Sequence, residues 1–119
     1  MEKYSIGLDL GGTKIIAGII NTQTGEVIAH AKKKTKKEKG SELVVQRIID
    51  TIQKALELSQ IPIDKIDSIG LGLAGQVDRK NGILIAAPNL DCFNINFKEI
   101  LETHFNKPVF IGNDVEVAT

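Results

Sequence analysis

Asp9-Leu10-Gly11-Gly12-Thr13-Lys14 stands between two apolar runs, Tyr4–Leu10 and residues 15–20, and this arrangement predicts two strands joined by a tight glycine turn. Because glycine has no side chain, the backbone N–H groups of such a turn can approach an anion closely. The threonine adds a hydroxyl and the lysine a cation, and the carboxylate of Asp9 can hold Mg²⁺ against a phosphate that it would otherwise repel. An ordinary hairpin explains the two glycines alone, but the whole string after a first strand favours a phosphate site. Its spacing differs from that of a Walker loop and of the Gly-x-Gly-x-x-Gly fingerprint.

The composition indicates a neutral globular chain. Its 119 residues carry a formal net charge of +0 and 42% of them are hydrophobic, which predicts one domain that buries about two thirds of its unfolded surface. Zero net charge argues against general affinity for nucleic acid. The single cysteine, Cys92, has no internal disulfide partner and favours a reducing cytoplasm. A packed side chain is its simpler interpretation, and a reactive thiol near a ligand pocket is the alternative. No apolar run reaches the ~20 residues of a membrane span, and no signal peptide is expected.

The rest of the chain alternates short apolar runs with two helical segments. Further strands are expected at residues 26–31, 66–74, 82–86 and 108–111, and helices at residues 41–58 and 96–104. Short connections come first and favour an antiparallel meander, whereas the later strands are linked by helices. This order predicts an α/β fold with a mixed sheet and helices packed against it.

The segment 41–58 has the clearest helical period. Its apolar stripe consists of Val45, Ile48, Ile49, Ile52 and Leu56. Ser41 is the expected N-cap of this helix, and Gln60 followed by Pro62 marks its exit. Asn96, with Glu99 three residues later, predicts a capped start for the second helix.

Residues 32–39, Lys-Lys-Lys-Thr-Lys-Lys-Glu-Lys, contain six lysines in eight positions. A nucleic-acid patch or a localisation signal is one interpretation of this run. A hydrated strand end and loop is the favoured one, because such runs usually stay solvated. The run can also attract anions such as ATP from a distance.

Four segments, in the same order, resemble the ROK family, which contains bacterial sugar kinases and sugar-responsive repressors. Residues 6–14 are similar to its first phosphate motif, and residues 70–78 are similar to its glycine-rich sugar-side segment. Residues 87–90, with an aromatic at Phe93, are similar to its "PNL" segment, and Asn113-Asp114 is similar to its catalytic Asn-Asp pair.

The resemblance implies the ribonuclease-H-like, actin-like fold, in a protein whose two lobes hold a nucleotide between them. Residues 1–119 are then expected to form the N-terminal lobe alone, as a single domain. The zinc-binding, cysteine-rich motif of the family is expected beyond Thr119, in the C-terminal lobe.

Phosphoryl transfer needs a phosphate cradle, a metal ion and a base near the acceptor hydroxyl. The expected ATP- and phosphate-binding residues are Gly7, Leu8, Asp9, Leu10, Gly11, Gly12, Thr13 and Lys14. Mg²⁺ is expected at Asp9, directly or through water. Asp114 is the expected catalytic base, because a carboxylate at a helix start stays ionised and can accept a proton; capping of that helix is the alternative. Gly75, Asn89 and Asn113 are the expected sugar-binding residues, with an ordinary loop or turn role as the alternative for each.

The chain departs from the family pattern just after Asp114. Family members usually carry a small residue and then asparagine there, whereas Val115 and Glu116 follow in this sequence. The extra negative charge of Glu116 near the expected base can change which sugar is accepted.

These features predict an ATP-dependent, glucokinase-like sugar kinase that transfers the γ-phosphate to a hexose hydroxyl, with the isolated lobe inactive. The alternative is the sugar-sensing lobe of a ROK-type transcriptional repressor; such proteins carry a DNA-reading helix-turn-helix ahead of the first strand, for which the residues before Tyr4 leave no room. A third hypothesis is an actin-like binding protein without transfer activity, and an intact Asp9, Lys14 and Asp114 argue against it. The expected partners are a sugar and ATP, and neither nucleic acid nor a membrane. The identity of the sugar and a homo-oligomeric state stay open, and the cytoplasm is the expected location.

Overall fold

The computed structural model describes residues 3–36, 40–90 and 92–113, and at Asn89 and Asn113 the backbone only. The predicted hairpin is confirmed: β1 (Tyr4–Leu10) pairs antiparallel with β2 (Lys14–Asn21). β3 (Val27–Lys34) continues the meander on the outer side of β2.

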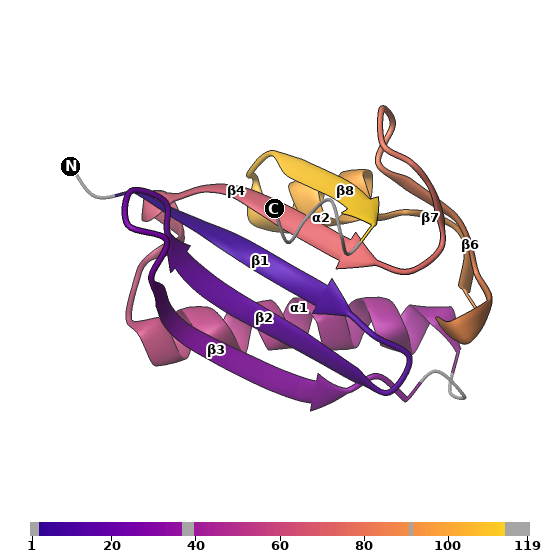
Figure 1. Cartoon of the computed structure of the whole chain (residues 1–119), viewed down its shortest axis with the longest axis horizontal. Helices are drawn as coiled ribbons and strands as arrows, with labels where there is room; N and C mark the ends of the chain where they lie inside the picture. The colour runs from indigo at the N-terminus through magenta and orange to yellow at the C-terminus, as the bar shows by residue number, and fades with distance from the viewer. Residues whose placement is uncertain (1–2, 37–39, 91, 114–119) are drawn as a thin grey trace.

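Two later strands extend the sheet beyond β1. β4 (Ile66–Leu73) runs parallel to β1, and β8 (Val109–Asn113) runs parallel to β4. In the described residues the five-stranded sheet therefore has the order β3-β2-β1-β4-β8 (Figure 1). The predicted mixed sheet is confirmed, and its parallel half requires crossover connections that a tight turn cannot supply.

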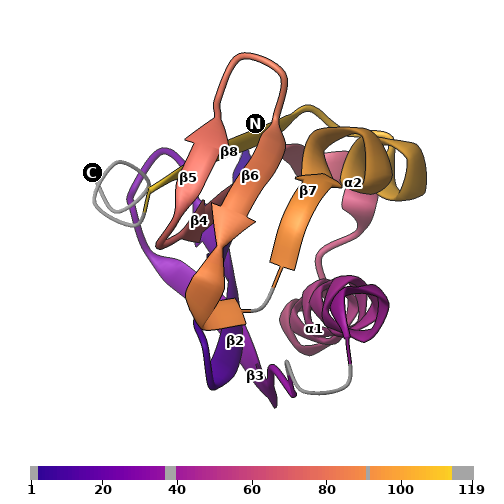
Figure 2. The same cartoon turned by 90° about the vertical axis from the view of Figure 1, so that its right-hand side faces the viewer.

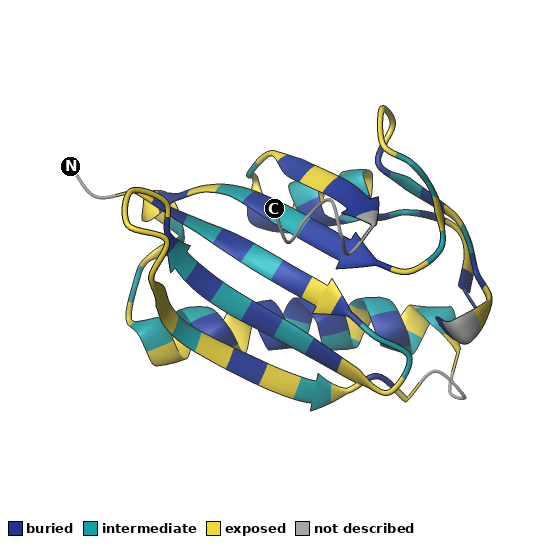
Figure 3. Ribbon diagram, viewed as in Figure 1, coloured by how far each residue is buried: buried dark blue, intermediate teal, exposed yellow. Residues whose placement is uncertain are grey.

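Helices α1 (Ser41–Ser59) and α2 (Phe97–Phe105) lie on one side of this sheet (Figures 1 and 2). α1 packs on β2 and β3, and the centre of its predicted stripe, Ile48, Ile49 and Ile52, is buried. Val45 and Leu56, at the ends of that stripe, are only partly buried. Burial along the strands alternates, as Figure 3 shows for β1 and β2. Burying one such aliphatic side chain stabilises the fold by about 1.5–3 kcal/mol.

The ends of the helices agree with the sequence at two of the three predicted points. Ser41 is not the N-cap; Gly40 holds that position with φ 102° and ψ 161°, and no side chain caps the helix. Only glycine adopts this conformation readily, and the N-cap therefore lies one residue before the predicted Ser41. Gln60 ends α1 in the left-handed region, as expected from the exit signal. The cap of α2 is confirmed, because the Asn96 side chain accepts a hydrogen bond of 3.0 Å from the Glu99 amide.

A three-stranded antiparallel sheet lies across the carboxyl ends of β1, β4 and β8, where Figure 2 shows it facing the viewer. It is formed by β5 (Gln76–Asp78), β6 (Ile83–Ala87) and β7 (Cys92–Asn96) in that order. The sequence predicted β6, one residue early, but neither β5 nor β7. β5 is too short to show alternation, and the alternation of β7 is broken by Asn94, whose φ is 54°.

Two 3-10 helices complete the described structure, η2 (Ile63–Lys65) before β4 and η3 (Pro88–Leu90) between β6 and β7. Cys92 is buried, with its Sγ 3.3 Å from the Leu90 carbonyl oxygen, which supports the packed interpretation. Among the described helices, none combines the length and the apolar character that crossing a membrane requires. The helix expected from Asp114 lies outside the described residues.

β3 runs three residues further than predicted and takes in the first lysines of the run at 32–39. The ladder with β2 continues to the pair Lys14–Lys34, and this pairing holds the lysines in a strand. Lys32 and Lys34 are exposed, as predicted for a hydrated strand end, and residues 37–39 lie outside the described part of the chain.

Candidate phosphate and sugar site

Three predicted site segments meet at one edge of the five-stranded sheet. Leu10, at the end of β1, pairs with Leu73 of β4, and Leu73 pairs with Asn113 of β8. Neighbouring strands lie about 4.8 Å apart, so the ends of β1 and β8 are about 10 Å apart. The glycine turn after β1, the turn at Gly75 after β4 and the end of β8 are therefore neighbours, although the first and the last are 102 positions apart in the sequence (Gly11 to Asn113).

The glycine turn between β1 and β2 is narrow. The Gly11 amide donates a hydrogen bond of 3.0 Å to the Lys14 carbonyl oxygen, and a Cβ at Gly11 would stand 3.0 Å from that oxygen. The amide N–H groups of Gly12 and Thr13 donate no hydrogen bond to any described residue. Two unpaired N–H groups at an exposed turn are a suitable cradle for an anion.

Thr35, which was not a predicted site residue, forms two hydrogen bonds to this turn from just after the end of β3. Its Oγ1 donates a hydrogen bond of 2.7 Å to the Gly11 carbonyl oxygen, and its amide donates one of 2.9 Å to the Thr13 carbonyl oxygen. Thr35 is fully buried although it stands within the lysine run. A single β-branched residue among lysines was the only signal in the sequence that could have pointed to it.

The predicted phosphate-binding residues of β1 differ in burial and in their distance from the turn. Leu8 and Leu10 are each 2% exposed and belong to the core, so only their backbone can face a ligand. Gly7 lies four residues before the turn, which is about 13 Å along a strand, and a Cβ there would approach Cδ1 of Ile20 at 3.1 Å. Packing against Ile20 therefore explains this glycine without a ligand.

Asp9 is the exposed residue of β1 and points to the face opposite α1. In the sheet register it lies between Ile16 and Gly72, and Gly72 lies beside Gly112. Both glycines are buried, whereas the Asp9 carboxylate is exposed and can therefore reach a metal ion or water. Among the described residues, no group of three or more His, Cys, Asp or Glu side chains is arranged to bind a metal by itself.

Gly75 has a packing role that the sequence did not indicate. A Cβ at this position would stand 2.7 Å from the Ala86 carbonyl oxygen and 3.2 Å from the Ala87 Cβ. The turn after β4 is thus pressed against β6, and Asn89 follows two residues after this contact, in η3. The backbone of Gly75 and the segment of Asn89 are therefore brought together; the side chains of Asn89 and Asn113 and all of Asp114 lie outside the described residues.

Positive charge gathers beside the glycine turn. Lys14 and Lys34 lie directly opposite each other on β2 and β3, and Lys32 follows on the same face. Like charges in this position repel and destabilise a sheet slightly. Among the described residues none of the three forms an ion pair, and an incoming anion would relieve the repulsion.

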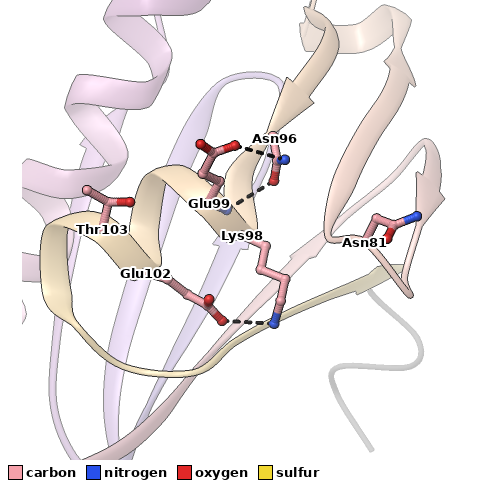
Figure 4. A pocket seen from close by; sticks show the side chains of 6 residues that line it. All are labelled: Asn81, Asn96, Lys98, Glu99, Glu102 and Thr103. Atoms are coloured by element: carbon pink, nitrogen blue, oxygen red, sulfur yellow. Dashed lines mark hydrogen bonds and ion pairs between the residues drawn. The ribbon is translucent and has the colours of Figure 1, made fainter.

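Figure 4 shows a second concave region, at the start of α2, away from the glycine turn. It is lined by Asn81, Asn96, Lys98, Glu99, Glu102 and Thr103, none of which was a predicted site residue. Lys98 and Glu102 form an ion pair of 2.8 Å, and the hydrogen bond from Lys98 lowers the pKa of Glu102. Glu102 also accepts a hydrogen bond of 3.0 Å from the Val109 amide, and Lys98 donates one of 3.3 Å to the Val109 carbonyl oxygen. This ion pair fixes the start of β8 and so contributes to the site only indirectly.

The ROK family model matches residues 5–119. The glucokinase of Thermotoga maritima is 34% identical over 110 residues, which are 92% of this chain and 33% of that protein. The xylose repressor of Caldicellulosiruptor bescii is 31% identical over 109 residues, 92% of this chain and 27% of the repressor.

The structure of a ROK family glucokinase from Streptomyces griseus in complex with glucose and AMPPNP superposes with a TM-score of 0.80 at 32% identity. The superposition covers 93% of this chain and 33% of that one. The fold is therefore the α/β, actin-like fold expected from the sequence, and the chain spans about a third of the length of the glucokinases that it matches.

Proposed function

Since this chain belongs to the ROK family, we propose that it forms the N-terminal lobe of an ATP-dependent sugar kinase that transfers the γ-phosphate to a hexose hydroxyl. The observation that carries the proposal is the convergence of the glycine turn, Gly75 and the end of β8 on one edge of the sheet. The carboxyl ends of strands in α/β sheets form the crevice in which ligands bind. The similarity to glucokinases, one of them with glucose and AMPPNP bound, supports the same function.

On the donor side, the N–H groups of Gly12 and Thr13 and the ammonium group of Lys14 hold the phosphates of ATP. These groups fit an anion because the two N–H groups have no partner among the described residues and the lysine is exposed. Asp9 is the proposed Mg²⁺ ligand, with water and phosphate oxygens completing the oxygen shell that this ion prefers. Bound ATP supplies the γ-phosphoryl group.

On the acceptor side, Asp114 accepts the proton of the sugar hydroxyl, and Asn89, Asn113 and the backbone at Gly75 hold the sugar. Asn113 ends β8 in the same row as Leu10, which would bring the acceptor next to the donor. A general base in this position contributes about 10²–10⁴ in rate.

The second candidate function is sugar sensing in a ROK-type repressor, because a xylose repressor is 31% identical over the same segment. Such a protein would bind sugar at this edge and respond by a change in DNA binding. The intact string from Asp9 to Lys14 favours the kinase, because sugar sensing alone needs no phosphate cradle.

A cytoplasmic location, in keeping with the single cysteine, and a homo-oligomeric state belong to the proposal as well. Zinc is proposed only for the cysteine-rich motif of the family, which is not in this sequence.

The test is a coupled assay of ADP release by the full-length protein that contains this chain. We expect release that depends on ATP, Mg²⁺ and a hexose, with glucose as the first sugar tried. Sugar-responsive DNA binding without ADP release from any hexose would favour the repressor and overturn the kinase proposal.

A further inference from the structure

Thr35 contributes two hydrogen bonds to the glycine turn from a position 24 residues away from Gly11. Its hydroxyl binds the Gly11 carbonyl oxygen at 2.7 Å, and its amide binds the Thr13 carbonyl oxygen at 2.9 Å. The carbonyl groups of Gly11 and Thr13 are thus directed to a residue that is completely buried. A carbonyl oxygen pointing outward at this place would repel a phosphate.

The direction of one carbonyl fixes the direction of the next amide. A trans peptide is planar, and its C=O and N–H bonds point to opposite sides. The described residues contain no cis peptide. The bond from the Thr35 hydroxyl to Gly11 therefore turns the N–H of Gly12 to the side opposite Thr35. The bond from the Thr35 amide to the Thr13 carbonyl oxygen holds the other end of the turn.

Thr35 is itself held from the side of α1. Nε of Arg47 donates a hydrogen bond to the carbonyl oxygen of Lys34, the residue before Thr35. α1 is packed on β2 and β3, so the segment from Lys34 to Thr35 is tied to the rigid core. The turn thus rests on a buried support, although it is itself exposed.

We propose that Thr35 is a positioning residue for the phosphate donor: by binding the carbonyl oxygens of Gly11 and Thr13, it holds the turn so that the N–H of Gly12 is presented to the phosphates of ATP. The role rests on the proposed phosphate site but is separate from it, since Thr35 is buried and touches no ligand. Without its hydroxyl, the peptide between Gly11 and Gly12 can rotate, and part of the binding energy is then needed to orient it.

The test uses the full-length protein and three variants. Thr35→Val removes the hydroxyl at nearly constant shape, and Thr35→Ser keeps it. Thr51→Val is the matched control, because Thr51 is equally buried and its Oγ1 donates a hydrogen bond of 2.6 Å to the backbone carbonyl oxygen of Arg47 within α1. That bond involves neither the turn nor the Arg47 side chain. Calorimetry gives the Kd of AMPPNP and of the sugar, steady-state kinetics give KM for ATP and for the sugar, and thermal unfolding gives Tm.

We expect Thr35→Val to raise the Kd of AMPPNP and KM for ATP about tenfold, a change equivalent to about 1.4 kcal/mol, with sugar binding changed less than twofold. Thr35→Ser should restore the affinity to within about twofold of the wild type. Thr51→Val should lower Tm without changing the ratio of the two affinities, which separates positioning from loss of stability.

Three results would overturn the proposal. The first is a Thr35→Val protein that binds AMPPNP as the wild type does; the second is an equal loss of affinity for nucleotide and sugar. If Thr35→Val does not fold, Thr35→Ala takes its place, because it removes the same hydroxyl donor with a smaller side chain. The third result is that neither Thr35 variant folds while Thr51→Val does, which would make the role of Thr35 purely structural. A wild-type protein that binds no AMPPNP would instead contradict the proposed function, and with it the role of Thr35.

Discussion

Replacement of Gly75 with alanine decides whether this glycine is required by packing or by a sugar. The new Cβ would stand 2.7 Å from the Ala86 carbonyl oxygen, whereas ordinary contact begins at 3.4 Å, so the two must separate by about 0.7 Å. The obstacle is the backbone of β6, which is paired with β5 and β7 and cannot turn aside as a flexible side chain would. Forcing extra volume into such a contact destabilises a protein by about 1–3 kcal/mol.

For a chain of this size, 1 kcal/mol shifts Tm by roughly 4 °C, and we therefore expect Gly75→Ala to lower Tm by about 4–12 °C. Gly70→Ala is the matched control in the same segment, because the nearest described atom to its Cβ is the Ile6 carbonyl oxygen at 4.0 Å. This control should change stability by no more than about 0.5 kcal/mol. Thermal unfolding of residues 1–119, followed by circular dichroism, measures both.

The same variant in the full-length protein is then titrated with sugar. The displaced turn should weaken sugar binding together with the loss of stability. If Gly75→Ala unfolds at the wild-type temperature but no longer binds sugar, the packing argument is refuted, and close approach of a sugar to the backbone is the correct explanation.

Four further predictions concern the site and its support. The isolated chain should fold but release no ADP in a coupled assay, because the proposed nucleotide site needs the remaining part of the protein; robust sugar-dependent release would contradict this. Asp114→Asn in the full-length protein should lower kcat by about 10²–10⁴ and leave sugar affinity intact, since the amide keeps the shape but accepts no proton; steady-state kinetics with calorimetry check it, and wild-type turnover would remove Asp114 from the mechanism. Gly12→Val should weaken binding of an ATP analogue more than binding of sugar, because the new side chain blocks the approach of phosphate to the turn. Steric blocking rather than backbone strain is the expected cause, since the described glycines with positive φ are Gly25, Gly40, Gly75 and Gly82, and Gly12 is not one of them. The hydrogen bond from Lys98 holds the pKa of Glu102 below its ordinary value of 4.5, so its contribution to stability is present above that pH and is lost as the pH falls through the lowered pKa. Thermal unfolding should accordingly show a Tm difference between wild type and Glu102→Gln at pH 7 that shrinks as the pH falls below 4.5, and a difference independent of pH would refute the assigned ion pair.

The sequence by itself determined the elements whose signals are carried by adjacent residues. The bounds of β1 follow from its apolar run and the glycines after it, and the buried stripe of α1 follows from a period of 3.6 residues. The cap at Asn96 needs only Glu99, three residues away. The ordered motifs were sufficient to predict the family, because each lies within one short segment.

Tertiary structure alone decided the strands, glycines and polar contacts whose partners are distant in the sequence. β5 and β7 exist because β6 lies between them, and their own residues show little strand character. Gly75 is required by Ala86, and Gly40, with φ 102°, holds the N-cap position that the sequence assigned to Ser41. Thr35 is the clearest case: a threonine in a lysine run has no local hydrogen-bond partner, and its role arises only when the pairing of β2 with β3 brings it against the carbonyl groups of the glycine turn. Helical periodicity and capping depend on interactions between residues that are close in the sequence. Burial and long-range hydrogen bonding depend on which segments the folded chain brings together.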